Sequence, residues 1–474
     1  MEKTVKTVFN LRWFEITPLK RGVNESLRTM IIPRSGWFLI SVIVALLVCS
    51  SFAAAVKDRE GAVRDDRAAM EKDARWLYND FQKGFAEAKR TGKPVLVVLR
   101  CVPCLACSGI DAQVLLQDSD LAPLLDQFVC VRVINANTLD LSMLQFDYDL
   151  SFSTLFFNGD GTVYGRYGSW AHQKNAQDKT TAGYKRALEA ALVLHRGYPA
   201  NKASLAGKQG VAMPFKTPLD IPGLAGRYKV ELDWKGKVVP SCVHCHQVGE
   251  AFRAYYREQK TTIPPSFIYP WPAPETLGLT LAPDQIARVQ SVTPDSVASK
   301  AGLQAGDELV TLDGQPLISI ADVSWALDHA PEAGTLAVGL QRGEAKKKLE
   351  LILPPEWRTK TDISKRVGTW SMRGMATGGL VLEDLPDDER SRHGLGNEKM
   401  GLLVKFVGQY GKHAAAKNAG FQKDDLIVDL GGASGRVTEG ELIGRILNKY
   451  RPGEKVKTTV VRNGQSVTLS LPIQ

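Results

Sequence analysis

The strongest constraint on the fold is an internal repeat near the C-terminus. Ser299–Asp307 reads SKAGLQAGD, and Lys417–Asp425 reads KNAGFQKDD. Each stretch is followed by an apolar run, Leu309–Leu312 or Leu426–Leu430, and then by a stretch with helical spacing. A repeat of this size predicts two copies of one small domain rather than one large core. The 474 residues leave room for further domains upstream.

The repeat resembles PDZ domains of the bacterial kind, above all in the text AGLQAGDEL. The resemblance implies two α+β domains, small β-barrels with capping helices, at 276–355 and 399–474. In that family a glycine-containing loop binds the terminal carboxylate of a peptide, and the next strand pairs with the peptide, so the implied partners are protein C-termini. The alternative is that one or both copies only pack against their neighbours. The implied peptide-binding residues are Leu277, Gly278, Leu279, Val323 and Leu327 in the first copy, and Gly401, Leu402, Leu403, Leu442 and Ile446 in the second.

Residues 70–200 show a second pattern, which begins with helical spacing from Trp76 to Ala88 that ends at Gly92. A buried strand at Val95–Leu99 leads directly into three cysteines, and a helix, a second strand, a hairpin and a last helix follow. This order, with AKRTGKPVLV before the cysteines, resembles exported proteins of the thioredoxin fold. The resemblance places the redox pair of a thiol-disulfide oxidoreductase at Cys104 and Cys107, with Cys101 as an extra thiol.

The three cysteines leave other interpretations open. A cysteine at the start of a helix has a lowered thiol pKa, so Cys104 suits the nucleophile and Cys107 the resolving thiol. Cys101 and Cys104 form a rival pair, with Pro103 between them. The cis-proline of the family is replaced by Ser153, which weakens an enzymatic interpretation. Alternatives are a structural disulfide, or copper or zinc held by the three thiols.

A CxxCH motif, typical of covalent haem attachment, lies in the segment 230–265. Cys242 and Cys245 would bond the haem vinyl groups, and His246 would bind the iron, which predicts haem c. The alternatives are zinc or a second dithiol. Covalent haem attachment takes place outside the cytoplasm, so this prediction depends on export.

The N-terminal region supplies such an export signal. Residues 36–56 contain no charge and are long enough to span a bilayer. Seven basic residues against three acidic ones precede this segment, so residues 1–35 should stay in the cytoplasm and everything after Val56 should face the periplasm. An uncleaved membrane anchor is favoured over a cleaved signal peptide ending near Ala55.

The remaining observations exclude other classes of protein. The net charge of +9 is spread along the chain without a long basic run, so no nucleic-acid partner is expected. No serine-protease motif occurs beside the PDZ-like copies, which excludes a serine protease. Residues 201–229, 266–275 and 356–398 are predicted to be linkers.

Two hypotheses follow from these patterns. In the first, the chain is an exported, membrane-anchored thiol-redox and electron-transfer protein that works with redox partner proteins. In the second, it is a non-catalytic adaptor whose PDZ grooves bind C-termini and whose thioredoxin-like part is vestigial.

Overall fold

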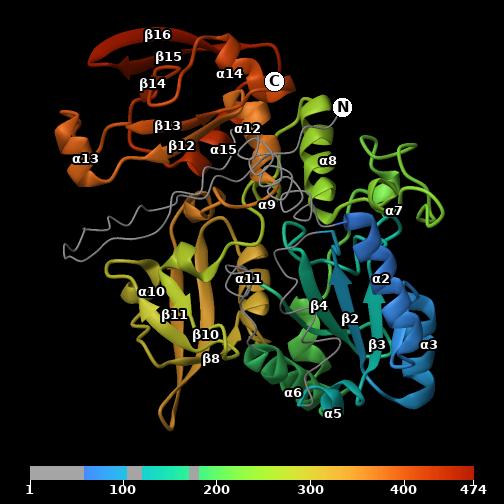
Figure 1. Cartoon of the computed structure of the whole chain (residues 1–474). Helices are drawn as coiled ribbons and strands as arrows, with labels where there is room; N and C mark the ends of the chain where they lie inside the picture. The colour runs from blue at the N-terminus through green and yellow to red at the C-terminus, as the bar shows by residue number, and fades with distance from the viewer. Residues whose placement is uncertain (1–57, 104–119, 170–180) are drawn as a thin grey trace, which may run out of the picture. The chain divides into compact units, whose positions relative to one another are not determined.

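Figure 1 shows the computed structural model, which describes residues 58–103, 120–169 and 181–474. The described residues belong to one unit, Asp58–Gln474. The first sheet of the unit has five strands in the order β1-β3-β2-β4-β5. Strands β1, β3 and β2 are parallel to one another, β4 runs antiparallel to β2, and β5 runs antiparallel to β4. Its strands are β1 (Trp76–Tyr78), β2 (Val95–Arg100), β3 (Val129–Val133), β4 (Phe152–Phe157) and β5 (Val163–Tyr167).

Helices cover both faces of this sheet. Because side chains alternate along a strand, Leu96 and Val98 of β2 pack in the core that contains α6, whereas Val97 and Leu99 pack in the core that contains α3. This double coverage explains the continuous apolar run of β2. The helices are α2 (Arg59–Lys72), α3 (Phe81–Thr91), α5 (Ala122–Leu125) and α6 (Ala182–Arg196).

The structure corrects the start of this domain. Trp76, predicted to begin a helix, belongs to β1, and the helix begins only at Phe81. Asn79 has a positive φ of 57°, and the Asp80 carboxylate accepts a hydrogen bond from the Lys83 backbone N–H at 2.9 Å, which caps the helix. Upstream of the predicted boundary at 70, α2 packs on the sheet through an ion pair between Asp66 and the fully buried Arg132.

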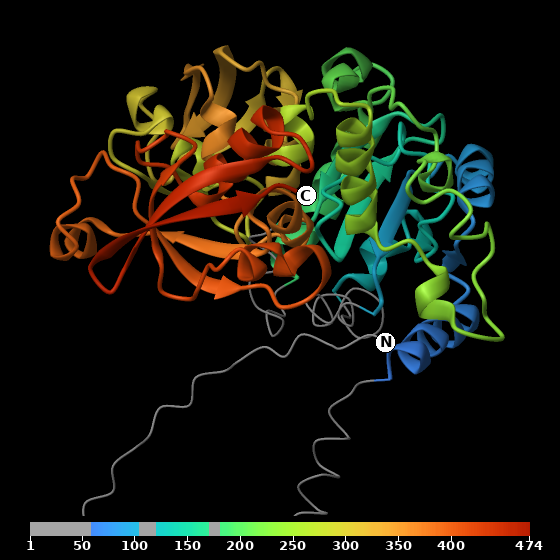
Figure 2. The same ribbon diagram turned by 90° about the horizontal axis from the view of Figure 1, so that it is seen from above.

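The two segments predicted to be linkers before the first repeat copy are packed parts of the unit. Lys208, in the predicted linker 201–229, is fully buried, and Tyr269 and Trp271 in the proline-rich segment 266–275 are also buried. In Figure 2, α8 lies beside the C-terminus, where Arg257 donates to the Gln474 carbonyl at 2.8 Å. The elements of this region are η3 (Lys202–Lys208), η4 (Pro218–Asp220), α7 (Val238–Ser241), α8 (Cys245–Glu258), α9 (Pro265–Ile268) and η5 (Pro274–Leu277).

The first repeat copy contains a two-stranded sheet, β6-β7, and a four-stranded sheet in the order β11-β10-β8-β9. Both pack around one apolar core with the helix α11. The elements are β6 (Leu279–Leu281), β7 (Val289–Val292), α10 (Val297–Lys300), β8 (Glu308–Leu312), β9 (Gln315–Pro316), α11 (Ile320–Asp328), β10 (Gly334–Arg342), β11 (Ala345–Leu353) and η6 (Trp357–Lys360).

The second copy forms one antiparallel sheet in the order β12-β13-β14-β15-β16. Its first strand, β12, comes from residues 356–398, which were predicted to be a linker. The elements are α12 (Thr369–Thr377), β12 (Leu380–Asp384), α13 (Asp387–Arg392), β13 (Leu402–Val407), η7 (Gly411–Ala414), α14 (Ala415–Asn418), β14 (Leu426–Leu430), α15 (Glu439–Lys449), β15 (Lys455–Arg462) and β16 (Gln465–Pro472).

The hydrogen bonds show which strands of the two copies correspond. Thr293 N–H donates to the carbonyl of Gly278 at 2.8 Å, and Gly408 N–H donates to that of Gly379 at 2.9 Å. Both glycines have a positive φ. The pairing of β6 with β7 shifts register before Leu281, as that of β12 with β13 does before Leu382. Therefore β12 is the counterpart of β6, and Gly379 rather than Gly401 is the counterpart of Gly278.

A buried polar cluster joins the first copy to the N-terminal sheet. Lys208 Nζ lies 2.5 Å from the Asp322 carboxylate on α11, and both side chains are at most 2 % exposed. Asp322 also accepts hydrogen bonds from the backbone N–H groups of Arg166 and Ile318, each at 3.0 Å. The Arg166 guanidinium stacks 3.5 Å from the ring of Trp325. Helix α11 is therefore fixed to the edge strand β5 by charge, hydrogen bonds and a cation–π contact.

Within the described ranges, no helix combines the length and apolar character needed to cross a bilayer, and the predicted span 36–56 lies outside those ranges.

Candidate functional site

The first of the three clustered cysteines stands at the end of β2. Cys101 follows the last strand residue, and its backbone N–H donates to the Ser151 carbonyl at 3.0 Å. Cys104 and Cys107, the predicted redox pair, lie outside the described residues. Cys101 thus lies at the C-terminal end of the central strand, three residues before the predicted nucleophile in the sequence.

Ser153 lies beside this edge, paired with Leu99 in the β2–β4 ladder. Its hydroxyl is buried and has no hydrogen-bond partner among the residues that the structure describes. Gly168, with φ of 116°, passes so close that a Cβ built there would lie 3.4 Å from the Ser153 hydroxyl oxygen. Ser153 therefore offers a polar group close to the end of β2, at the position where the resemblance to the thioredoxin fold leads us to expect a proline.

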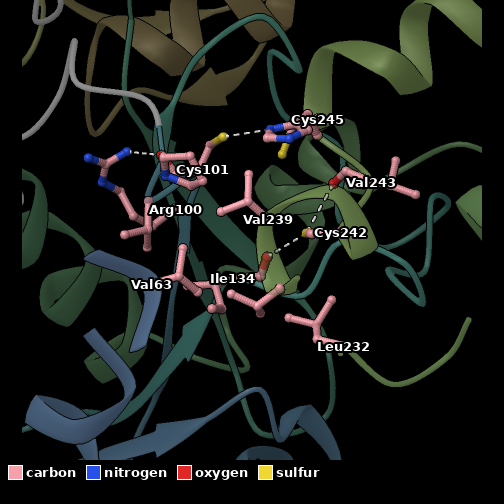
Figure 3. Close-up of a pocket in the computed structure, with 13 residues that line it drawn as sticks. Val63, Arg100, Cys101, Ile134, Leu232, Val239, Cys242, Val243 and Cys245 are labelled. Carbon is pink, nitrogen blue, oxygen red and sulfur yellow. Dashed lines mark hydrogen bonds between the residues drawn. The ribbon is translucent and has the colours of Figure 1, made fainter. Parts of the chain in front are cut away.

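The CxxCH segment packs directly against the end of β2, although the two are far apart in sequence. His244 Nδ1 lies 3.4 Å from Cys101 Sγ. Figure 3 shows this contact, with Cys245 beside it and Cys242 on the other side of the segment. His244 is the N-cap of α8, and its backbone N–H donates to the Gln247 side chain at 2.8 Å, which fixes the backbone of His244 at the start of the helix. Cys101 of the first cysteine motif and His244 of the CxxCH segment, predicted to belong to separate sites, are therefore in contact.

Burial determines the protonation state of these groups. Desolvation, and then the neighbouring His246, lowers the pKa of His244 to about 4, so its imidazole is neutral at pH 7. A neutral imidazole can accept the hydrogen bond of the Cys101 thiol. Burial raises the pKa of Cys242 to about 11, and its Sγ donates to the Ile134 carbonyl at 3.3 Å. Cys242 is therefore an unreactive thiol in this arrangement.

Two adjoining pockets surround these side chains. The narrower one, bordered by Cys101, Cys242, Ile134 and Leu232, leaves about 20 Å³ of free space, which is room for about one water molecule. The wider one has a volume of about 370 Å³ and is bordered by Cys101, Cys245 and His246, among others. His246 Nδ1 lies 2.9 Å from the Glu250 carboxylate in the first turns of α8. The wider pocket is where a substrate sulfur can approach Cys101 and Cys245.

The CxxCH side chains fit a covalent haem only in part. A haem requires Cys242, Cys245 and His246 to face one space. Cys245 and His246 border the wider pocket, but Cys242 borders only the narrow one, which is far too small for a porphyrin. Attachment would therefore need Cys242 to move, and haem c stays a prediction from the motif.

The copper or zinc site predicted at Cys101, Cys104 and Cys107 has two ligands outside the described residues, and it also stays a prediction. In the part of the chain that the structure describes, no group of three or more His, Cys, Asp or Glu side chains is arranged to hold a metal.

We expect Cys242 to resist alkylation in the folded protein. With a pKa of about 11, its thiolate fraction at pH 8 is on the order of 10⁻³, and the alkylation rate should rise about tenfold per pH unit up to that pKa. Timed iodoacetamide labelling followed by peptide mass spectrometry measures this. Rapid labelling at pH 8 would contradict the burial of Cys242.

The same labelling experiment checks the haem prediction. A haem thioether would leave Cys242 unlabelled even after unfolding, and protein made in a haem-c-competent host would absorb in the Soret region. Loss of that absorbance in Cys242→Ala would identify the attachment site.

The apolar residues predicted to bind a peptide in the first copy lie in the domain core, and other residues border the adjacent pocket. Val323 and Leu327 are buried in the domain core, as are Leu277 and Leu279. Two other residues of α11, Ile320 and Ser324, border a pocket of about 520 Å³ together with Leu281 of β6. Ile320 and Ser324 are one helical turn apart, and Ile320 also belongs to the core, so the apolar pattern of the helix did not identify the pocket-lining positions.

The predicted residues of the second copy do not form an open groove. Leu402 and Leu403 lie in β13, which pairs with β12 on one edge and β14 on the other, so that the strand has no free edge there. Gly401 precedes this inner strand. Leu442 and Ile446 are fully buried in the core. The prediction chose the wrong strand because β12 lies far upstream, beyond α13.

Family comparisons agree with two of these domains. A thioredoxin-like family model matches residues 76–159, and a PDZ domain model matches residues 288–342. A "Probable periplasmic serine endoprotease DegP-like" from Pseudomonas fluorescens is 24% identical over 180 residues, which cover 38% of this chain and 36% of that protein. The "Periplasmic pH-dependent serine endoprotease DegQ" of Escherichia coli is 28% identical over 144 residues, which cover 30% of this chain and 28% of that protein. The chain thus spans 36% of the length of the first relative and 28% of the second.

Solved structures of HtrA-type proteins are also similar in part. "HtrA-type protease AlgW with tripeptide" is 26% identical, with a TM-score of 0.17, over 20% of this chain and 30% of that one. The "HtrA3 PDZ Domain Bound to a Phage-Derived Ligand" is 23% identical, with a TM-score of 0.14, over 16% of this chain and 76% of that one. The chain therefore carries a thioredoxin-like domain together with a PDZ domain homologous to the PDZ regions of HtrA-type periplasmic proteases.

Proposed function

We propose that this chain is an exported, membrane-anchored thiol–disulfide exchange protein that recruits its substrates through PDZ binding of their C-termini. The contact between Cys101 Sγ and His244 Nδ1 at 3.4 Å carries the proposal. It supports a single thiol site that combines the end of β2, three residues before Cys104, with the CxxCH segment. An adaptor with a vestigial thioredoxin fold has no need of a second cysteine motif at this place.

In the proposed reaction, the Cys104 thiolate attacks one sulfur of a substrate disulfide. The bond between the substrate sulfurs breaks, a mixed disulfide forms, and the other substrate sulfur leaves as a thiolate. Cys107 then attacks the mixed disulfide and releases the second thiolate, and both thiolates take up protons. The substrate gains two electrons, Cys104 and Cys107 form a disulfide, and a dithiol donor restores them while it is oxidised.

The groups of the described site support this reaction. The neutral imidazole of His244 holds the Cys101 thiol, which precedes the nucleophile by three residues in the sequence, and the Ser153 hydroxyl, which has no partner among the described residues, is able to donate a hydrogen bond. The wider pocket gives a substrate sulfur access to this edge of the sheet. No step in this reaction uses a haem. Electron transfer through a haem c at Cys242, Cys245 and His246 is a separate proposal, which the Soret measurement above tests.

Location supports the proposal as well. The uncharged segment 36–56 with its basic flank predicts a membrane anchor, and the curated relatives are named as periplasmic. Thiol–disulfide exchange on structural disulfides belongs to such an oxidising compartment.

We expect Cys104→Ser to reduce the turnover of a small peptide disulfide, with a dithiol as electron donor, by a factor of at least about ten, down to the rate without protein. The matched control is Cys130→Ala, which removes a fully buried thiol in β3 whose pKa burial raises to about 12. This control should keep the wild-type rate. Equal rates for wild type and Cys104→Ser would overturn the proposed exchange activity and favour the adaptor.

A further inference from the structure

The 520 Å³ pocket of the first PDZ copy has walls from two domains. Leu281, Ile320 and Ser324 form the side that belongs to the PDZ copy, between β6 and α11. Gly168 and Ser169, at the end of β5, form the side that belongs to the thioredoxin-like domain. A ligand in this pocket therefore contacts both domains at once.

The edge of β6 that faces this pocket is unpaired in the described part of the chain. β6 pairs only with β7 there. Gly278 C=O and Ala282 N–H both bond toward β7, so the alternation along the strand directs the backbone groups of Leu279 and Leu281 to the opposite edge. This edge can accept an additional strand.

In the second copy, the corresponding edge belongs to β12, and a side chain of the protein pairs with it. There the backbone N–H of Leu382, the counterpart of Leu281, donates to the Glu439 carboxylate at 2.8 Å. Glu439 is the first residue of α15, as Ile320 is of α11, and its carboxylate is held by the buried Arg373 at 2.6 Å. An acceptor oxygen of the chain itself thus satisfies this edge in the second copy.

Intramolecular packing also covers the helix of the second copy. A Cβ built on Gly440 would lie 3.2 Å from Ile363, and one built on Gly444 would lie 1.9 Å from the Tyr269 hydroxyl. In the first copy, an apolar Ile320 replaces the glutamate. Among the described residues, no acceptor of the chain closes this edge of β6, so a ligand can supply one, and the first copy is the one that can bind it.

The pocket of the first copy adjoins the thiol pocket. The segments 147–149 and 366–368 lie between the two pockets. They are joined to each other by an ion pair of Arg366 with Asp147 at 2.8 Å and by a hydrogen bond from Gly368 N–H to the Asp149 carboxylate at 3.0 Å. Arg366 and Asp147 border the first pocket, while the neighbouring Val367 and Asp149 border the pocket of Cys101 and Cys245. A bound peptide that leaves the first pocket therefore needs to pass only the segment at Arg366 and Val367 to reach the pocket of Cys101 and Cys245.

We propose that the first PDZ copy binds the extended C-terminal tail of a substrate protein and directs a disulfide-bonded cysteine of that tail to the thiol site. This inference rests on the proposed function and specifies its substrate. The tail pairs antiparallel with β6, its carboxylate lies at Leu277–Leu279, and its upstream residues pass Leu281 toward Gly168 and Ser153. The cysteine then enters the exchange reaction described above, with the same electron balance.

The position of the cysteine in the tail follows from chain length. An extended chain covers about 3.3 Å per residue, so ten residues cover roughly 33 Å, the width of a small domain. Three tail residues pair with β6, and a few more cross the pocket. We expect the best substrates to carry the cysteine about five to ten residues before the carboxyl end.

The test uses synthetic peptides whose single cysteine, at position 3, 7 or 20 from the carboxyl end, is disulfide-bonded to a fluorescent thiol. Release of that thiol by the full chain measures kcat/KM. We expect the position-7 peptide to exceed both others by about tenfold, and C-terminal amidation to remove this advantage. Equal rates for acid and amide forms, or for all three positions, would overturn the tail-binding inference.

Two controls separate the possible failures. Ile320→Glu, which copies Glu439, should bring the ratio of acid to amide rates to about one, whereas Val310→Glu, at an exposed position of β8, should leave that ratio unchanged. If all peptides and small disulfides react no faster than with Cys104→Ser, the proposed function itself fails. If small disulfides react and the ratio is already one in the wild type, only the tail inference fails. That wild-type comparison holds even if Ile320→Glu does not fold.

Discussion

Asp322→Ala is expected to destabilise the protein by about 3–5 kcal/mol, because it leaves Lys208 charged and unpaired in the interior. Both side chains are buried, with Lys208 fully inaccessible. The carboxylate also accepts two backbone N–H groups, which would lose their partner. Burial lowers the pKa of Lys208 even in the wild type, so part of the cost should be relieved when the lysine of the variant releases its proton. Urea denaturation of the full chain measures the loss as the difference in the free energy of unfolding between wild type and variant.

The control for Asp322→Ala is Asp388→Ala, which breaks an exposed pair with Arg392 at 2.9 Å. Such a pair is worth about 0.3–0.5 kcal/mol. The double variant Lys208→Met, Asp322→Leu should recover part of the stability, since it removes the buried charge as well as its partner. A loss below about 1 kcal/mol for Asp322→Ala would mean that water reaches Lys208 and that the interface between β5 and α11 is open in solution.

Glu439→Ala is expected to cost a similar amount, about 3–5 kcal/mol, and to free the edge of β12. The change leaves the guanidinium of Arg373 without its two-point contact and Leu382 N–H without an acceptor. The amide hydrogen of Leu382 should therefore exchange faster with deuterium, which hydrogen-exchange mass spectrometry of the β12 peptide measures.

Glu439→Gln is the matched variant for this second prediction. It keeps an acceptor oxygen for Leu382 but removes the charge opposite Arg373, so its effect on stability should be intermediate and the exchange of Leu382 should stay slow. Unchanged exchange in Glu439→Ala would show that another group closes this edge.

The sequence predicted the elements that depend on local signals. The helix stop at Gly92, the strand after it, the hairpin of β4 and β5 and the last helix around Tyr184 are all present. Each depends on turn residues or apolar periodicity within a short window. Trp76 was assigned to the wrong element because its apolar spacing continues that of α3, and only the positive φ of Asn79 separates them.

Long-range partners could not be predicted in this way. Nothing in the sequence connects Cys101 with His244, which lie 143 positions apart, or Lys208 with Asp322. The start of the second PDZ copy was missed for a related reason. Its first strand is separated from the second by α13 and a loop, so the glycine before Leu402 resembled an opening loop more than Gly379 did. Sequence patterns identified the chemical groups, but the folded chain determines which of them meet.

The joint between α11 and β5 has a consequence for how a ligand is held. A PDZ domain on a flexible tether would capture a tail and then have to find the thiol site by diffusion. Here helix α11, which we propose to contact the tail, and strand β5 are joined through Asp322, so the spacing of the two pocket walls is set before any ligand binds. Orientation is settled during folding rather than at each encounter, and a PDZ fragment cut out at 276–355 would lose it, along with the buried surroundings of Trp325.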